Sequence, residues 1–133
     1  MKVAISAILC VLALIWMGCE NTSKDVASLY VEFSWEGMKK CDMGNPQMQI
    51  NGIPDQTKFL KINMYDKAYG FDHGTQRIVY EGSRKIARGK LTEITGPCPP
   101  HQPGRYKITV KAIDKNEVII GIGSMVRDFP EIN

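Results

Sequence analysis

The chain has 133 residues, with 17 basic and 14 acidic side chains and a formal net charge of +3 at pH 7. This length suits one domain, and a charge so near neutral does not indicate nucleic acid or an anionic surface as a partner. The only concentration of basic residues is Arg84, Lys85, Arg88 and Lys90. Because no aromatic residues are interleaved with it, we interpret it as a solvated loop.

The first segment in chain order is a short apolar leader. Lys2 precedes an apolar run from Val3 to Met17, and Gly18-Cys19 is followed by a polar stretch. This layout is typical of a secretory signal, and the run is shorter than the roughly 20 apolar residues that span a bilayer comfortably. We therefore expect residues 1–18 to be a signal peptide, with an uncleaved anchor and ordinary cleavage as the alternatives.

The junction at Cys19 resembles a lipobox, the motif at which a bacterial lipoprotein signal is cut before a lipid-modified cysteine. Gly18 fits the small residue beside the cut, whereas Trp16 and Met17 depart from the motif. The resemblance implies lipidation of Cys19, export from the cytoplasm, and a location in the bacterial cell envelope on a membrane. Residues 19–28 are polar and lack a sustained apolar period, so we expect them to be a flexible tether.

Residues 29–133 are predicted to form a single all-β, mainly antiparallel domain, because the dominant hydrophobic period is two and no long segment has a helical period. A single helical turn within Ser83–Arg88 is the only helix that we expect there. The predicted strands are Leu29–Trp35, Lys58–Tyr65, Thr75–Tyr80, Arg105–Ile113 and Asn116–Arg127, the last preceded by a hairpin turn at residues 114–116.

Alternation along these strands predicts which side chains face the core. The predicted buried sets are Leu29, Val31, Phe33 and Trp35; then Leu60, Ile62 and Met64; then Tyr106, Ile108, Val110 and Ala112; and last Val118, Ile120, Ile122 and Val126. Gly121 and Gly123 within the last strand are predicted to permit a bulge or close sheet packing.

The cysteines between the predicted tether and the end of the chain are Cys41 and Cys98. In an exported chain they can form a disulfide, with two buried free thiols as the alternative. The bridge would close a loop of 98 minus 41, or 57, residues and contribute roughly 3 to 4 kcal/mol. A zinc site would need both cysteines together with His73 and His101 at long range, so no metal site is predicted.

The stretch from Gly96 to Gly104 contains four prolines in nine residues and leads directly into Arg105-Tyr106. Proline fixes the backbone and removes N–H groups, so such a loop is preorganised. The loop can be a pocket wall with fixed amides and carbonyls, or a rigid corner that blocks edge pairing. Composition alone favours the corner.

The run Gly96-Pro97-Cys98-Pro99-Pro100 followed by Arg105-Tyr106 resembles the phosphatidylethanolamine-binding protein (PEBP) family, also called Raf kinase inhibitor-like proteins. Two further segments agree with it in the family's order, residues 41–59 and residues 64–73. The resemblance extends roughly from Phe33 to Arg127. It implies a β domain whose pocket binds small anions such as phosphate or a phosphorylated headgroup.

The resemblance implies ligand-binding roles for Asp66, His73 and Tyr106, and a pocket-lining role for Gly96, Pro97, Cys98 and Pro99. An imidazole and a phenol can donate hydrogen bonds to phosphate oxygens. Asp66 would orient His73 or bind the amine of a zwitterionic headgroup. Each residue also has a plain structural interpretation: Asp66 as a turn cap, His73 as a loop residue, and Tyr106 as an aromatic at the edge of the core.

The sequence departs from the family's pattern at several positions. Gly104 stands where the family has a second pocket histidine, and Gly74 stands where it has tryptophan; Lys67 and Ala68 replace a proline and a second aspartate. His101, three residues before Gly104, could swing into the vacant position.

No serine lies in a nucleophile elbow and neither histidine has a recognisable catalytic partner motif, so we predict no enzyme and no cofactor. The sequence predicts a membrane-tethered, non-catalytic PEBP-like binding module for a small anionic or zwitterionic phosphorylated ligand. The alternative is a protein-interaction or protease-inhibitor module on the same scaffold with a vestigial pocket. A third possibility is a purely structural envelope protein.

Overall fold

The computed structural model describes residues 19–131, so the predicted signal peptide lies outside the described residues. This part of the chain is all-β, which confirms the predicted fold class. Its strands are β1 (Asn21–Ser28), β2 (Tyr30–Ser34), β3 (Gln47–Asn51), β4 (Thr57–Asp66), β5 (Phe71–Val79), β6 (Lys85–Ile86), β7 (Gly104–Asp114) and β8 (Val118–Phe129). Between residues 19 and 131 no helix is long and apolar enough to cross a membrane.

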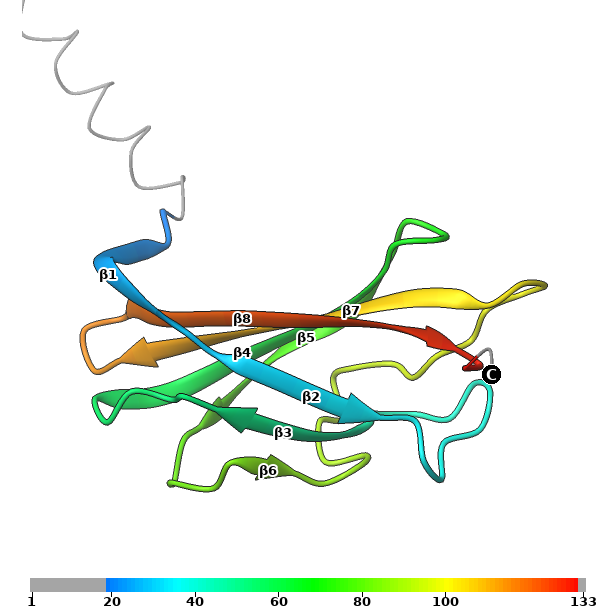
Figure 1. The fold of residues 1–133 in the computed structure, drawn as a ribbon, viewed down its shortest axis with the longest axis horizontal. Coiled ribbons are helices and arrows are strands. Elements are labelled where there is room, and N and C mark those ends of the chain that lie inside the picture. The colour runs from blue at the N-terminus through cyan, green and yellow to red at the C-terminus, as the bar shows by residue number, and fades with distance from the viewer. Residues whose placement is uncertain (1–18, 132–133) are drawn as a thin grey trace, which may run out of the picture.

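The strands form two sheets. The larger sheet has the order β1-β8-β7-β4-β5 and the smaller has the order β2-β3-β6 (Figure 1). Pairing is antiparallel except for β1, which runs parallel to β8. Hairpin connections join β4 to β5 and β7 to β8. Because β4 and β7 are antiparallel, the β4–β5 turn lies at the same end of the larger sheet as the start of β7, and the β7–β8 turn lies at the opposite end, beside the start of β4.

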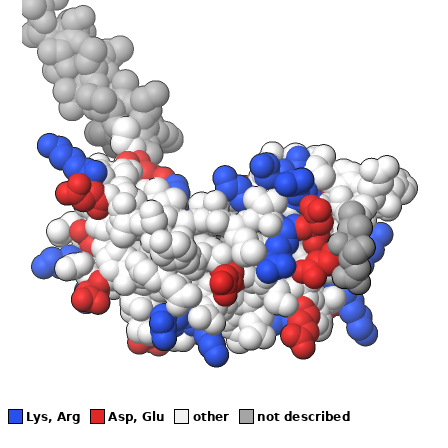
Figure 2. Space-filling model, in the orientation of Figure 1, with Lys and Arg blue, Asp and Glu red and all other residues white. Residues whose placement is uncertain are grey.

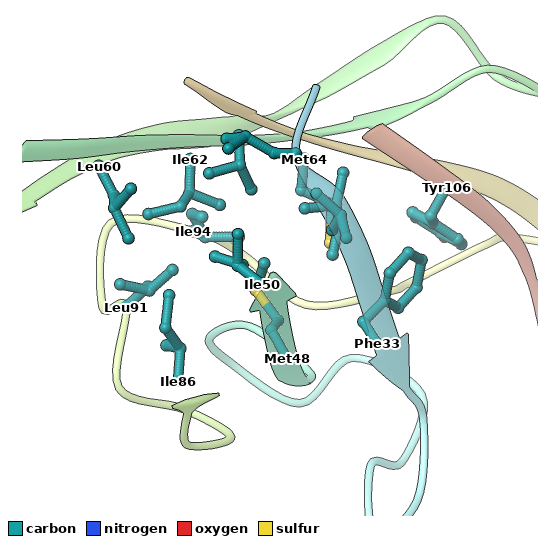
Figure 3. Close-up of a cluster of buried hydrophobic side chains, with 14 of the residues drawn as sticks. Phe33, Met48, Ile50, Leu60, Ile62, Met64, Ile86, Leu91, Ile94 and Tyr106 are labelled. Atoms are coloured by element: carbon teal, nitrogen blue, oxygen red, sulfur yellow. The ribbon is translucent and has the colours of Figure 1, made fainter. Parts of the chain in front are cut away.

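The core lies between the two sheets, with β4 and β7 contributing from one side and β2, β3 and β6 from the other (Figure 3). Three of the predicted buried faces are confirmed. All of their residues have exposed fractions of 6% or less: Leu29, Val31, Phe33, Trp35, Leu60, Ile62, Met64, Tyr106, Ile108, Val110 and Ala112. Period-two alternation therefore placed most of the core correctly, because each of these strands covers the core with one face only.

The predicted buried face of β8 is only partly right: Ile120 packs partly buried against the core, but the register shifts between Ile119 and Gly121, and Ile122 turns outward. Ile122 is 38% exposed, whereas Ile119 is 3% exposed and Gly121 is also buried. The inner face of β8 carries glycines because the chain around Leu29 crosses it closely: a Cβ on Gly123 would collide with the Leu29 carbonyl oxygen. The prediction that these glycines permit close packing is confirmed. Because glycine has no side chain, the inner face of β8 shows no run of alternating apolar residues in the sequence.

The segment predicted as a flexible tether over residues 19–28 is instead mostly strand β1. Its pairing with β8 starts at Asn21 opposite Val118 and ends at Ser28 opposite Ile122, with an irregularity between. Edge strands can be polar because only one side of the backbone is paired and both faces meet solvent. The polar composition of β1 therefore resembles that of a flexible linker, although the segment is a strand.

The predicted helical turn within Ser83–Arg88 is also corrected, since Lys85–Ile86 forms strand β6. Ile86 is 3% exposed, and this strand pairs with β3 at Met48 and Gln49. β3 itself was not predicted. Its two buried apolar side chains, Met48 and Ile50, give only a short alternation among polar residues.

Candidate functional site

A cavity of about 500 Å³ opens at one end of the larger sheet. Four separate segments form its wall: the end of β4, the start of β5, and the loops around Cys41 and Cys98. The residues that line it are Cys41, Asp42, Met43, Asp66, Tyr69, Phe71, His73, Thr95, Gly96, Cys98 and Pro100. The fold thus brings the predicted carboxylate, imidazole and proline-rich loop together in one place.

Asp66 is the last residue of β4 and is 2% exposed. Its Oδ1 accepts hydrogen bonds from the backbone amides of Ala68 (2.9 Å), Tyr69 (3.3 Å) and Arg105 (3.2 Å). Asp66 is therefore a turn cap and a cavity residue at once, because capping uses only one of its two oxygens. The three amides fix the carboxylate without cancelling its charge.

His73 lies near the start of β5 and is 7% exposed. Its Nδ1 lies 3.1 Å from both the carbonyl oxygen and the Oγ1 of Thr95. A carbonyl oxygen can only accept, so Nδ1 carries the proton and Nε2 is left as an acceptor in the neutral ring. Burial lowers the pKa of His73, and the hydrogen bond that His73 donates to the Thr95 carbonyl and the charge of Asp66 oppose this shift only partly.

Gly74 explains how Thr95 reaches His73. Its φ is +116°, and a Cβ there would collide with the carbonyl oxygen of Glu93. With no side chain in the way, residues 93–95 run directly beside β5, and the Thr95 amide donates to the His73 carbonyl at 2.8 Å. A larger residue at this position would push the loop away from the imidazole.

Tyr106 does not line the cavity. It is fully buried behind His73, with the two ring centroids 5.2 Å apart, and it packs on Trp35 from the other side. Its hydroxyl has no hydrogen-bond partner among residues 19–131. Burial, together with the negative charge of Asp66, raises the pKa of Tyr106, so the phenol stays protonated.

The position left free by Gly104 is not empty. A Cβ on Gly104 would lie 2.5 Å from the Tyr106 hydroxyl oxygen, so the phenol fills the space that a side chain would take. His101 lies on an exposed loop and is not among the residues that line the cavity. The structure therefore does not bring His101 into the site, because Tyr106 occupies the place into which it could have swung.

Cys41 and Cys98 form a disulfide on the cavity wall. The bridge joins the loop after β2 to the proline-rich loop, and the Cys41 amide donates to the Pro97 carbonyl at 2.7 Å. Pro97 and Pro99 are buried behind the wall and do not line the cavity, whereas Gly96, Cys98 and Pro100 do. The loop is thus both a rigid corner and part of the cavity wall.

Sequence reasoning missed the apolar part of the lining. Met43, Tyr69 and Phe71 surround the carboxylate and imidazole and are 67%, 42% and 57% exposed. Met43 and Tyr69 lie in loops and Phe71 is the first residue of β5, so the alternation along a strand could not have indicated them. The charged lining consists of Asp42 and Asp66, and the cavity is therefore negative at neutral pH.

The chain matches no protein-family model and no curated protein sequence. Solved structures that share its fold include the two that follow. A proposed PEBP homologue from Chlamydia trachomatis is 14% identical, with a TM-score of 0.57 over 82% of this chain and 100% of that chain. YbcL of E. coli, described as a new member of the mammalian PEBP family, is 16% identical, with a TM-score of 0.53 over 79% of this chain and 99% of that chain.

The architecture is that of a two-sheet β domain with a cavity at one end of its larger sheet. More specifically, it is a PEBP-like fold, which confirms the fold that the proline-rich motif implied. At these identities the similarity defines the fold alone, and the function has to be argued from the cavity.

Proposed function

We propose that the protein is a non-catalytic binding module for a small zwitterionic phosphorylated ligand, whose cationic end enters the cavity. The observation that carries this proposal is the pairing of the buried Asp66 carboxylate with a neutral His73 in a cavity that no lysine or arginine of residues 19–131 lines. An ammonium group complements a fixed carboxylate, whereas a phosphate there would face it with no neutralising cation.

The protonation state of His73 also favours a ligand whose ammonium group points into the cavity. With its pKa lowered, His73 is mostly neutral at pH 7 and offers Nε2 as an acceptor to an ammonium N–H. The rings of Tyr69 and Phe71 line the same cavity and can stabilise a cation through their faces. The phosphoryl group would remain at the mouth, where water can solvate it.

The membrane attachment is also part of the proposal. Cys19 is exposed and is a free cysteine in the structure, so it is accessible to the modification that the lipobox resemblance implies. The protein would then be an envelope protein held on a membrane by its N-terminal lipid.

The proposal is tested by NMR titration of the His73 ring with phosphoethanolamine, ethanolamine and inorganic phosphate. We expect shifts with the first two and little response to phosphate. Asp66→Asn keeps an acceptor oxygen for the three backbone amides but removes the charge, so it should weaken binding while leaving the fold intact. Asp55→Asn, at an exposed turn away from the cavity, is the matched control. A response to phosphate alone would reverse the proposed polarity, and no response to any of the three would reject ligand binding.

A protein-binding role is the second candidate, because Met43, Tyr69 and Phe71 are exposed together around the cavity. Clustered exposed apolar side chains are a usual feature of protein interfaces. Inhibition of a panel of proteases would test it. Under this reading Phe71→Ser abolishes inhibition, while His73→Ala and Tyr106→Phe retain it. Loss of inhibition in the last two variants would point back to the cavity.

A further inference from the structure

The N-terminal end of the domain is attached to the sheet without a spacer. Glu20 lies between the exposed Cys19 and the first residue of β1, and its carboxylate pairs with Lys61 (2.7 Å) and Lys111 (2.5 Å). Hydrogen bonds from Lys111 and Lys61 lower the pKa of Glu20 to about 2, so it stays charged under physiological conditions. The backbone is paired with β8 at Asn21 and Thr22, directly after Glu20, and again at Ala27 and Ser28.

This attachment lies at the end of the larger sheet opposite to the cavity. Asn21 pairs with Val118, directly after the β7–β8 turn, and that turn lies beside Thr57, where β4 begins. The cavity lies where β4 ends, at Asp66. Nine residue steps of β4 separate the two ends, or about 30 Å at roughly 3.3 Å per residue. Figure 1 shows β1 at the left of the molecule and the loops after β2 and before β7 at the right.

Two parts of the described surface between the two ends are polar, the face that Figure 2 shows and the outer face of the larger sheet. In Figure 2 basic and acidic side chains are interspersed along the visible face of the domain. On the outer face of the larger sheet, a shallow hollow is lined only by Lys61, Asn63, Thr75, Thr109 and Lys111. A headgroup could not travel along this polar surface with its acyl chains attached.

We propose that the cavity takes its ligand from the aqueous phase and not from the membrane that carries Cys19. The proposal rests on the function and the lipid attachment proposed above, and it identifies the source of the ligand as a free, water-soluble molecule. A flexible tether over residues 19–28 would have let the domain rotate until the cavity faced the bilayer. Because Glu20 and β1 are held on the larger sheet, the domain cannot rotate in this way, and the cavity faces away from the bilayer.

The geometry is tested with residues 19–133 coupled through the Cys19 thiol to a maleimide lipid in phosphatidylcholine vesicles. Trp35 is the only tryptophan of residues 19–133, and it lies at the cavity end, with its ring centroid 5.4 Å from that of Tyr106. Energy transfer from Trp35 to a dansyl-labelled lipid in the same vesicle should be weak. Coupling instead through Tyr65→Cys in a Cys19→Ser background attaches the cavity end of β4 and should strengthen the transfer clearly. Equal transfer from the two attachments would overturn the geometry.

The source of the ligand is tested separately by Trp35 emission. We expect soluble phosphoethanolamine to change the emission equally in free and Cys19-coupled protein. Phosphatidylethanolamine added to the vesicles that carry the protein should have no effect. A response to that lipid in the Cys19-coupled protein would overturn the inference. A free protein that ignores soluble phosphoethanolamine would instead reject the proposed function, while the energy-transfer result would still report the geometry.

Discussion

Replacing both Cys41 and Cys98 with serine should lower the free energy of unfolding by about 3 kcal/mol. The bridge spans a sequence separation of 57, for which the chain-entropy relation gives about 4 kcal/mol. The backbone of Cys41 offsets part of this stabilisation. Its φ of +66° is a left-handed conformation, which costs a residue with a side chain about 1 kcal/mol. The loop can relax from this conformation once the bridge is gone, so we expect the difference of the two.

Thermal and urea unfolding measure this effect. For a domain of about 115 residues, 3 kcal/mol corresponds to a fall in Tm of roughly 10–15 °C. Cys19→Ser is the matched control and should leave Tm unchanged, because Cys19 is a free, exposed cysteine. The variant Cys41→Gly with Cys98→Ser should have about the same Tm as the double serine variant, because the loop of that variant has already relaxed from the left-handed conformation that glycine would tolerate. A loss below about 1 kcal/mol in the double serine variant would refute the entropic account.

Three further changes have defined outcomes. Gly104→Ala should lower the free energy of unfolding by about 2 kcal/mol, because its Cβ would lie 2.5 Å from the Tyr106 hydroxyl in a packed core; thermal unfolding measures it, and an unchanged Tm would contradict the packing. Tyr106→Phe removes a buried hydroxyl without a partner and should raise that free energy by about 1 kcal/mol in urea unfolding, whereas a loss would indicate a hydrogen bond to Asp66. Because burial lowers the pKa of His73, the folded protein binds fewer protons than the unfolded chain below about pH 6.5. Stability should therefore fall as the pH drops through that value, and His73→Gln should flatten this part of the pH profile.

The alternation of side chains was sufficient to predict strands whose two faces differ. In β7, for example, Tyr106, Ile108 and Val110 are all at most 1% exposed, as predicted. It failed at β1 and β8 for different reasons. β1 is an edge strand without a buried face of its own, and the inner face of β8 is made of glycines, which carry no hydrophobic signal. In both cases the determining contact is with a segment distant in sequence.

The site was predicted in part because its polar residues belong to recognisable motifs. Asp66 and His73 were identified in this way, and the structure places both on one cavity. The aromatic wall of Tyr69 and Phe71 was not, since these residues gain their role from where the β4–β5 hairpin places them. Alternation predicted that Tyr106 is buried, but not that its phenol fills the space beside Gly104, because that depends on an absent side chain.

The two glycines that depart from the family's pattern have a common physical meaning. Gly74 lets the Glu93 carbonyl lie against β5, which holds Thr95 on the His73 ring, and Gly104 lets the Tyr106 phenol fill the space beside it. At each glycine a neighbour lies where a side chain would be, the Glu93 carbonyl beside Gly74 and the Tyr106 phenol beside Gly104. A tryptophan at residue 74 or a histidine at residue 104 would therefore collide with that neighbour and disrupt the cavity. Under the proposed function, recognition by this cavity would therefore depend on Asp66, a neutral His73 and the aromatic side chains of Tyr69 and Phe71.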